Sequence, residues 1–181
     1  MLTDLQARKL TRYFQVYDID DDGKIEASDF ERIVENVRLL HGADGRDADA
    51  LRDAYMTLWE QLRASADYDR DRGVDLDEWL AYWQIVLEDD SRYEAEVEGI
   101  TGRLLSVFDL DEDGTIGPPE FRDFYGIFGL AVSLADSVFE TLDLDADGRI
   151  TRVELLTISR QFFRGDDAEA PGNLLFGPYG A

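Results

Sequence analysis

The sequence predicts an all-α protein in which four helix–loop–helix units form two compactly packed pairs. Four 12-residue windows, at residues 18–29, 67–78, 109–120 and 143–154, hold 21 of the 41 acidic residues. Apolar residues at helical spacing flank every window, and an aliphatic residue stands at position 8 of each one. An acidic loop between two amphipathic helices therefore repeats four times along the chain.

The first four helices are expected to surround the first two windows. Thr3 and Gln6 have the spacing of a capping box, which predicts the start of the first helix. His41 and Gly42 predict the end of the second helix. The apolar faces in chain order are Leu10, Phe14 and Tyr17; Phe30, Ile33, Val34, Val37 and Leu40; Leu51, Tyr55, Leu58, Trp59 and Leu62; and Trp79, Leu80, Trp83, Val86 and Leu87.

The last four helices are expected to surround the third and fourth windows. Ser91, with Glu94 three residues later, predicts the cap of the fifth helix, and Ser133 predicts the start of the seventh. Pro118 and Pro119 predict the start of the sixth helix, and the eighth is expected to end near Gly165. The apolar faces are Val97, Leu104 and Phe108; Phe121, Phe124, Tyr125 and Phe128; Phe139 and Leu142; and Leu155, Leu156, Ile158, Phe162 and Phe163.

These elements suggest a first pair in residues 1–90, a second pair in residues 91–165 and a tail in residues 166–181. The junction at residues 88–90 is too short to let the two halves move as independent lobes. Four apolar residues in the tail are expected to pack against the helical core, and these are Leu174, Leu175, Phe176 and Tyr179.

The spacing of oxygen-bearing residues inside the windows points to calcium. Calcium takes six to eight oxygen ligands, and an EF-hand loop supplies them from positions 1, 3, 5, 7, 9 and 12, with a sharp turn at position 6. At position 7 the ligand is the main-chain carbonyl. The candidate ligands are Asp18, Asp20, Asp22, Lys24 and Asp29; Asp67, Asp69, Asp71, Gly73 and Glu78; Asp109, Asp111, Asp113, Thr115 and Glu120; and Asp143, Asp145, Asp147, Arg149 and Glu154.

Two of the four loops depart from the full pattern. Position 12 of the first loop is Asp29, one methylene shorter than glutamate, which favours six-fold coordination and predicts mixed calcium and magnesium binding at loop 18–29. Arg72 occupies the turn position of the second loop, where it must take a positive φ at a cost of about 1–2 kcal/mol. Micromolar binding is worth about 8 kcal/mol. We therefore expect four ions, with three as the alternative if loop 67–78 does not bind.

The aliphatic residues at position 8 predict how the loops pair. Neighbouring EF-hand loops meet through a short antiparallel β contact, so Ile25 is expected to face Val74 and Ile116 to face Ile150.

With these loops, the chain resembles the sarcoplasmic calcium-binding proteins over nearly its whole length, and most closely their bacterial calerythrin-like members. The resemblance also rests on the spacing of 49 residues from Asp18 to Asp67, against 34 from Asp109 to Asp143, and on the ending at residues 171–179. It implies a compact fold and a role as a calcium buffer or transporter. Because members commonly have one degenerate loop, it also leaves the three-ion count open.

Composition narrows the class of function. A formal net charge of −23 argues against nucleic acid or an anionic membrane as partner. The chain has no cysteine and one histidine, His41, so we expect no enzyme, and no leader pattern precedes the first helix, so we expect a cytoplasmic protein. We also expect a monomer.

Methionine usage separates a buffer from a sensor. Calcium sensors expose a Met-rich groove to their targets, whereas this chain has two methionines. A calcium buffer is therefore favoured over a calcium-switched regulator of a protein target. A third reading is a small-molecule cavity lined by Trp59, Trp79 and Trp83, as in EF-hand photoproteins, although rings at helical spacing more often form core.

Overall fold

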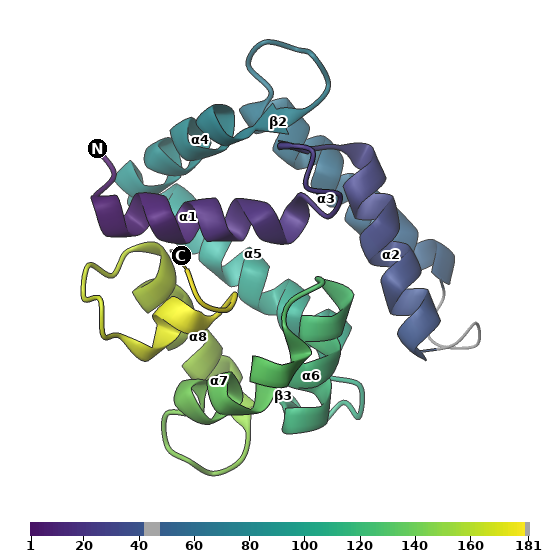
Figure 1. The fold of residues 1–181 in the computed structure, drawn as a ribbon, viewed down its shortest axis with the longest axis vertical. Coiled ribbons are helices and arrows are strands. Elements are labelled where there is room, and N and C mark those ends of the chain that lie inside the picture. The colour runs from purple at the N-terminus through teal and green to yellow at the C-terminus, as the bar shows by residue number, and fades with distance from the viewer. Residues whose placement is uncertain (42–47, 180–181) are drawn as a thin grey trace.

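Eight α-helices and four two-residue strands form most of the regular structure in residues 1–41 and 48–179, the part of the chain that the computed structural model describes. The helices are α1 Asp4–Tyr17, α2 Ala27–His41, α3 Ala48–Ala66, α4 Leu76–Glu88, α5 Asp90–Phe108, α6 Pro118–Ile127, α7 Ala135–Leu142 and α8 Arg152–Phe163. Two 3₁₀ turns, η1 Val132–Leu134 and η2 Pro171–Leu174, complete the order (Figure 1). The predicted end of α2 at Gly42 and the side chains of His41 and Leu51 lie outside the described residues.

The four strands join the loops in two antiparallel pairs. Strand β1 (Lys24–Ile25) pairs with β2 (Val74–Asp75), and β3 (Thr115–Ile116) pairs with β4 (Ile150–Thr151). Ile25 lies opposite Val74 and Ile116 lies opposite Ile150, as predicted, and all four side chains are buried. Each pair of loops is thereby fixed as one unit.

The helix starts agree with the sequence in some cases and differ in others. The capping box of Thr3 and Gln6 is present at α1, and Pro118 is the first residue of α6. The prediction that Ser91 caps α5 is wrong, because Asp89 is the N-cap and accepts from the main-chain N–H of Ser91 at 2.9 Å and of Arg92 at 3.1 Å. A carboxylate is the stronger acceptor at the positive end of a helix.

The predicted start of α7 at Ser133 is also wrong. Ser133 lies inside the 3₁₀ turn η1, and α7 begins after Leu134, which makes no side-chain cap. The turn has its own hydrogen bond, from the N–H of Leu134 to the carbonyl of Ala131 at 2.8 Å, so this segment is already folded before the helix begins. The predicted end of α8 near Gly165 agrees with its C-cap at Arg164.

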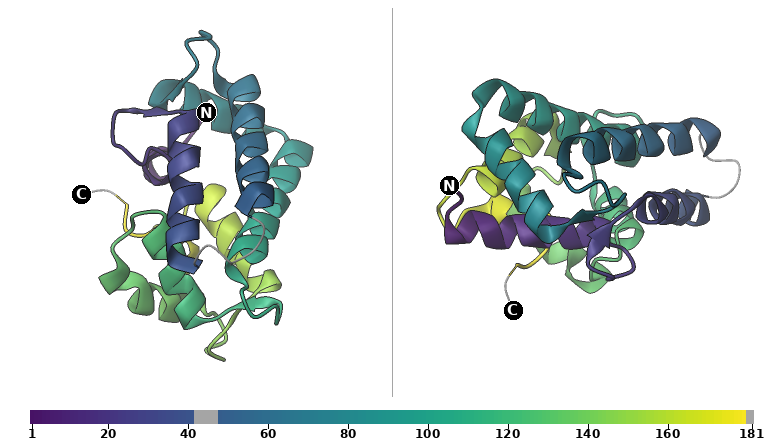
Figure 2. Two further views of the ribbon diagram at one scale, coloured as in Figure 1. Left: turned by 90° about the vertical axis from the view of Figure 1, so that its right-hand side faces the viewer. Right: turned by 90° about the horizontal axis from the view of Figure 1, so that it is seen from above.

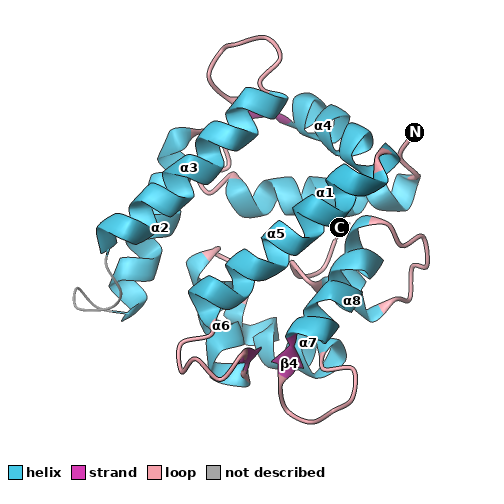
Figure 3. Ribbon diagram, turned by 180° about the vertical axis from the view of Figure 1, so that it is seen from behind, coloured by secondary structure: helices cyan, strands magenta, loops and turns pink. Residues whose placement is uncertain are grey.

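The helices of the two halves pack against one another. Helix α1 lies between α4 and α8 and contacts both (Figure 1), and α5 runs from α4 to α6 and also contacts α8 (Figure 3). Helices α2 and α3 lie side by side, and α2 contacts α6 of the second half (Figure 2). One cluster of buried apolar side chains includes residues from both halves. The division of the chain at residue 90 stays a prediction.

The C-terminal segment lies against the helices. Leu175 and Phe176 are 1% and 3% exposed, and the ring of Phe176 stacks on Tyr13 of α1 with centroids 4.3 Å apart. Turn η2 packs against α7 and α8, and Leu174 is partly buried there. In residues 1–41 and 48–179, none of the helices has the length and apolar character that crossing a membrane would require.

Candidate metal centres

All four loops bend in the same way, at positions 4 and 6. The residues at position 4 have φ between 57° and 64°, and those at position 6 have φ between 81° and 90°. Position 4 holds Asp21, Arg70, Glu112 and Ala146, and position 6 holds Gly23, Arg72, Gly114 and Gly148. Arg72 therefore takes the left-handed conformation predicted for it, at 81°, and loop 67–78 has the same backbone turn as the three loops with glycine.

The carboxylate at position 12 has the same role in every loop. One of its oxygens accepts from the N–H at position 2 and the other accepts from the N–H at position 9. The bonds are Asp29 with Ile19 (3.0 Å) and Glu26 (2.7 Å); Glu78 with Tyr68 (2.8 Å) and Asp75 (3.1 Å); Glu120 with Leu110 (2.6 Å) and Gly117 (2.8 Å); and Glu154 with Leu144 (3.0 Å) and Thr151 (2.8 Å). The shorter Asp29 makes both bonds, so it holds its loop closed as the glutamates do.

The aspartate at position 1 ties the first half of each loop. Asp18, Asp109 and Asp143 each accept from the N–H groups at positions 5 and 6, at distances from 2.7 to 3.2 Å. Asp67 accepts through Oδ2 from the main-chain N–H of Arg72 at 3.3 Å, while its Oδ1 is buried and has no hydrogen-bond partner among the residues that the structure describes. A buried carboxylate oxygen without a donor is costly unless a cation is bound to it.

Four groups of carboxylates converge, one in each loop. In each group, one oxygen per residue lies within 4.8 Å of the others, and the groups are Asp18, Asp20 and Asp22; Asp67, Asp69 and Asp71; Asp109, Asp111 and Glu120; and Asp143, Asp145 and Glu154. Among the predicted ligands, Asp29, Glu78, Asp113 and Asp147 stand outside these groups. The position 7 residues Lys24, Gly73, Thr115 and Arg149 stand at or directly before the strands.

These groups fit a calcium ion. Two oxygens bound to one calcium at 2.3–2.6 Å lie at most about 5 Å apart, and the groups meet that limit at 4.8 Å. Hard carboxylate oxygens are the ligands that calcium and magnesium prefer. The donor set therefore suits a divalent cation in each loop.

Burial and neighbouring charge set the pKa of the loop carboxylates. Burial raises the pKa of Asp18 and of Asp29, which is 1% exposed, against the opposing effect of the N–H groups that each accepts. Burial, with the charge of Asp147 beside it, also raises the pKa of Asp145. The acidic loops thus hold negative charge that is poorly solvated in places, which a bound cation would relieve.

Two basic residues contact carboxylates of the partner loop. Lys24 forms an ion pair with Asp71, and Arg149 forms an ion pair with Asp113. The Lys24 ammonium lowers the pKa of Asp71, and the Thr115 hydroxyl, followed by other contacts that include Arg149, lowers that of Asp113. The sequence analysis considered Lys24 and Arg149 for their carbonyl oxygens alone. A basic residue at position 7 opposite a position 5 aspartate is the signal that would have found them.

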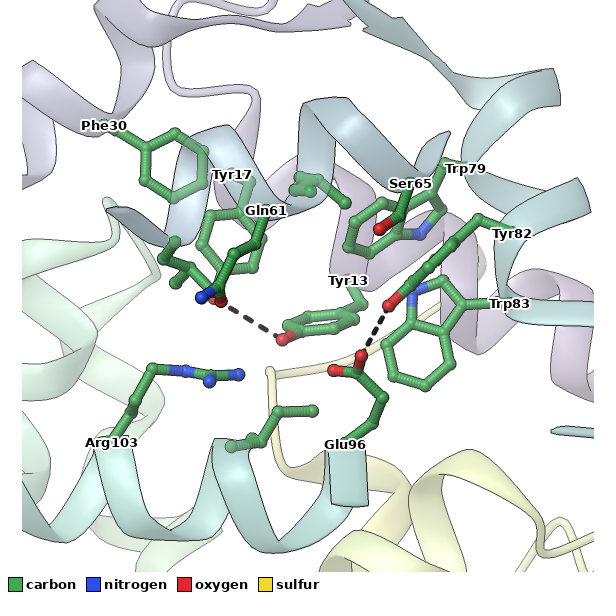
Figure 4. A pocket seen from close by; sticks show the side chains of 13 residues that line it. Tyr13, Tyr17, Phe30, Gln61, Ser65, Trp79, Tyr82, Trp83, Glu96 and Arg103 are labelled. Atoms are coloured by element: carbon green, nitrogen blue, oxygen red, sulfur yellow. Dashed lines mark hydrogen bonds between the residues drawn. The ribbon is translucent and has the colours of Figure 1, made fainter. Parts of the chain in front are cut away.

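A cavity of about 100 Å³ lies among α1, α3, α4 and α5 (Figure 4). Trp79 and Trp83 line it as the sequence suggested, but Trp59 does not belong to its lining. Glu96 accepts from the hydroxyl of Tyr82 at 2.6 Å at one side of the cavity. The indole Nε1 of Trp83 is buried and makes no hydrogen bond within residues 1–41 and 48–179.

Comparison with known proteins supports the loop assignment. A model of the EF hand matches residues 11–34, 103–125 and 134–159, which contain loops 18–29, 109–120 and 143–154. The matched residues do not include loop 67–78, the loop with Arg72 at its turn.

Curated relatives align over nearly the whole chain. Calexcitin-1 of Caenorhabditis elegans is 26% identical, over 94% of this chain and 85% of its own. Calerythrin of Saccharopolyspora erythraea is 24% identical, over 91% and 96%. The sarcoplasmic calcium-binding protein beta chain of Penaeus is 25% identical, over 97% and 95%. These identities lie close together and do not single out the calerythrin-like members.

Solved structures share the fold. The coelenterazine-binding protein of Renilla muelleri, in its calcium-loaded apo form, has a TM-score of 0.75 at 24% identity and covers 97% of this chain and 99% of its own. The sarcoplasmic calcium-binding protein of amphioxus has a TM-score of 0.74 at 20% identity, with coverage of 98% and 99%.

Proposed function

We propose that this chain, a calcium-binding EF-hand protein similar to the sarcoplasmic calcium-binding proteins, acts as an intracellular calcium buffer with four ion sites. The observation that carries the proposal is the shared framework of the four loops, in which the position 12 carboxylate joins positions 2 and 9. A loop that is already folded needs little rearrangement to bind, which suits a protein that takes up ions without a large change of shape.

We assign the ligands of each site by position in the loop. The carboxylates at positions 1, 3, 5 and 12 and the carbonyl at position 7 surround the ion. At loop 109–120 a water molecule supplies position 9, because Gly117 has no side chain there. The unpartnered oxygen of Asp67 supports an ion at loop 67–78 as well.

We further propose that loop 18–29 takes magnesium as well as calcium. Magnesium demands six ligands in near-octahedral geometry. Asp29 reaches the loop with one methylene fewer than glutamate, so its two oxygens reach a bound ion together less easily. Monodentate ligation by Asp29 would give this loop the lower coordination number.

A buffer is favoured over a calcium-switched regulator because the groove that a target would need is filled. Leu175 and Phe176 of the chain itself lie in the core, and Met56 is the one internal methionine. We also propose that the chain belongs with the calerythrin-like members, that it is cytoplasmic and that it is a monomer. If calcium binding exposes a large apolar surface during a titration, a calcium-switched regulator is favoured instead.

Calorimetric titration with calcium tests the site count. We expect four ions for the parent chain and three for each of Glu120→Gln and Glu154→Gln, because both changes delete the charge and one oxygen of the position 12 ligand. Glu140→Gln is the matched control, since Glu140 is an exposed residue of α7 outside the loops. A parent stoichiometry of two would contradict the proposal.

The cavity between α1, α3, α4 and α5 favours a second candidate function, the binding of a small planar aromatic molecule. Rings of Tyr13, Tyr17, Trp79 and Trp83 line it, together with the polar side chains of Gln61, Glu96 and Arg103. Its volume of about 100 Å³ is below the roughly 150 Å³ of an apolar cavity that binds benzene, so a single ring would enter only with a small outward shift of the lining side chains. The similarity in fold to a coelenterazine-binding protein agrees with this candidate.

Benzamide is a suitable probe for the cavity because it is neutral and planar, and its amide can hydrogen-bond to a polar side chain of the lining such as Gln61 or Arg103. We expect it to quench tryptophan fluorescence saturably, and Trp83→Phe to weaken it. Trp59→Phe, outside the cavity lining, is the control. Quenching that does not saturate, or that is equal in Trp83→Phe and Trp59→Phe, would contradict binding of a small aromatic molecule in the cavity.

A further inference from the structure

In each loop pair, one basic side chain crosses to a candidate ligand of the other loop. Lys24, at position 7 of loop 18–29, pairs with Asp71 at position 5 of loop 67–78. Arg149, at position 7 of loop 143–154, pairs with Asp113 at position 5 of loop 109–120. Both contacts join the same two loop positions, although they lie in opposite halves of the chain.

The contact is one-directional within each pair. The reciprocal position 7 residues are Gly73 and Thr115, and neither carries a positive charge. Gly73 also makes room for the crossing, since a Cβ at this residue would lie 3.0 Å from Cδ of Lys24. Loops 67–78 and 109–120 therefore receive a cationic side chain, and loops 18–29 and 143–154 provide it.

At loop 109–120 the crossing side chain and its neighbours occupy the whole carboxylate of Asp113. Oδ1 accepts from the N–H of Thr115 at 2.9 Å and from its hydroxyl at 2.5 Å, and Oδ2 accepts from Arg149. Asp113 stands outside the group formed by Asp109, Asp111 and Glu120, as Asp147 does in loop 143–154, whereas Asp71 remains in its group although Lys24 contacts it. An ion entering this loop has to share Asp113 with a guanidinium.

We infer that Lys24 and Arg149 set the calcium affinity of the partner loop, with Arg149 lowering that of loop 109–120 and Lys24 lowering that of loop 67–78. This inference rests on the proposed function, because it requires both loops to bind calcium. It assigns the affinity of one site to a side chain of its neighbour, so the two sites of each pair are adjusted through a direct contact.

The positive charge explains why calcium affinity falls, and the use of the main-chain carbonyl at position 7 explains why the effect is larger on the partner loop. A positive charge beside a carboxylate opposes a second cation there, and for a divalent ion 5–10 Å away through solvent, with the dielectric constant of water, the effect on affinity is about fourfold to sixteenfold. Both ion pairs are partly exposed to solvent, so this dielectric applies to them. Position 7 ligates through its main-chain carbonyl, so a change of side chain leaves the ligands of its own loop intact. The larger effect therefore falls on the partner loop.

Site-resolved titration of Arg149→Gln tests the inference. The amide N–H groups of Gly114 and Gly148 donate to the position 1 aspartates of their own loops, so their NMR chemical shifts report occupancy loop by loop. We expect the calcium concentration for half-saturation of loop 109–120 to fall about fourfold to sixteenfold, and that of loop 143–154 to change less than twofold. Lys24→Gln is expected to act likewise on loop 67–78, reported by the amide of Arg72.

Arg152→Gln is the matched control. Arg152 lies in the same loop as Arg149 and carries the same charge, but it pairs with Glu98 and not with a loop carboxylate. We expect less than a twofold effect on either loop. Equal shifts for Arg149→Gln and Arg152→Gln, or a larger effect of Arg149→Gln on loop 143–154, would overturn the inference. A parent chain whose glycine amides do not respond to calcium would refute the proposed function itself.

Discussion

At the scale of single residues, Arg72 shows how strongly a loop can impose its backbone. A residue with a side chain takes φ of 81° here, where the other three loops have glycine. The sequence predicted this conformation because the 12-residue spacing of the acids leaves no other residue for the turn. The strain is local, since the hydrogen bonds of Glu78 match those in the other loops.

Arg72→Gly tests that strain. Glycine takes positive φ without a steric penalty, so we expect the free energy of unfolding to rise by about 1 kcal/mol and the calcium affinity of loop 67–78 to rise with it. Chemical denaturation measures the free energy of unfolding, and calcium titration measures the affinity of the loop. Arg70 also has a positive φ in this loop but does not occupy the turn position. Arg70→Gly therefore shows whether a gain in stability is specific to the turn or follows from any glycine at a positive φ.

Asp29→Glu tests the proposed magnesium site. The longer side chain reaches the ion with both oxygens, so we expect the preference of loop 18–29 for calcium over magnesium to increase. The side chain of Asp29 is 1% exposed, so the added methylene must be accommodated by its buried neighbours. Competition titration with both ions measures the selectivity. Unchanged selectivity in a folded variant would mean that side-chain length at position 12 does not control ion choice here.

At the scale of elements, the sequence predicted which helices and strands exist better than where two of them begin. Periodicity located all eight helices, because each buries an apolar face against the core. It missed the cap at Asp89, since local hydrogen bonds select among neighbouring polar residues, and the start of α7 after Leu134, which has no side-chain cap to recognise. Asp89 ends α4 and begins α5 at once, which a search for one cap per helix overlooks.

The candidate sites were likewise predicted in part from the sequence. Regular spacing was enough to identify the carboxylates that converge in each loop, because an EF-hand loop has a fixed length. The ion pairs of Lys24 and Arg149 were missed, since the β pairing sets position 7 of one loop opposite position 9 of the other, and only the course of the long side chains brings them to the position 5 aspartates. The spacing of residues along the chain predicts which loops pair, but it does not show which way such a side chain turns.

Lys9 of α1 connects three elements from inside the protein. Its side chain is 0% exposed, and its ammonium donates to the carbonyls of Gln161 and Gly165 at 2.9 and 2.8 Å and to Oδ1 of Asn173 at 2.9 Å. The carbonyls belong to the end of α8, whose negative dipole favours a cation. One lysine therefore holds α1, α8 and the C-terminal segment together.

Burial lowers the pKa of Lys9 to about 8, against the opposing effect of Asp166. The folded protein thus loses this proton at lower pH than the unfolded chain, whose lysine pKa is 10.5. Between these values the unfolded state binds more protons, so the contribution of Lys9 to the free energy of unfolding rises with pH. Below pH 8 the full cost of burying the charge is present.

Comparison with Lys9→Met isolates this effect. We expect the variant to be less stable by about 1–3 kcal/mol, because three acceptors lose their donor. We also expect the stability difference between parent and variant to widen as pH rises from 8 to 9.5. Urea unfolding at fixed calcium measures both. A difference that narrows over this range would contradict a charged, buried Lys9.

At the scale of the whole molecule, repulsion among acids opposes folding until cations bind. Four calcium ions would offset eight of the 23 net negative charges. At 100-fold excess over its dissociation constant, each ion adds about 2.7 kcal/mol to the free energy of unfolding if the unfolded chain binds none. Chelation is therefore expected to lower the melting temperature strongly. Equal melting temperatures with calcium and with chelator would contradict four sites that favour the folded chain.

The last prediction concerns the C-terminal segment, which completes the core shared by both halves. Phe176 stacks on Tyr13 and lies 5.0 Å from Phe162, centroid to centroid. The main-chain oxygen of Phe176 accepts a hydrogen bond from Nε of Arg12 at 2.9 Å. Burial of Leu175 and Phe176 is worth about 1.5–3 kcal/mol for each side chain, which offsets the entropy lost when the segment becomes ordered.

Removal of residues 171–181 should therefore uncover an apolar groove between α1, α7 and α8. We expect the truncated chain to melt at lower temperature and to bind a dye for apolar surfaces in the presence of calcium. Phe176→Ala in the full chain should reproduce the loss of stability, at about 3–5 kcal/mol, whereas Pro178→Ala should not, because Pro178 is exposed. A truncated chain that matches the parent in both measurements would show that the segment adds nothing to the core. The case for a closed buffer would then rest on the small number of methionines alone.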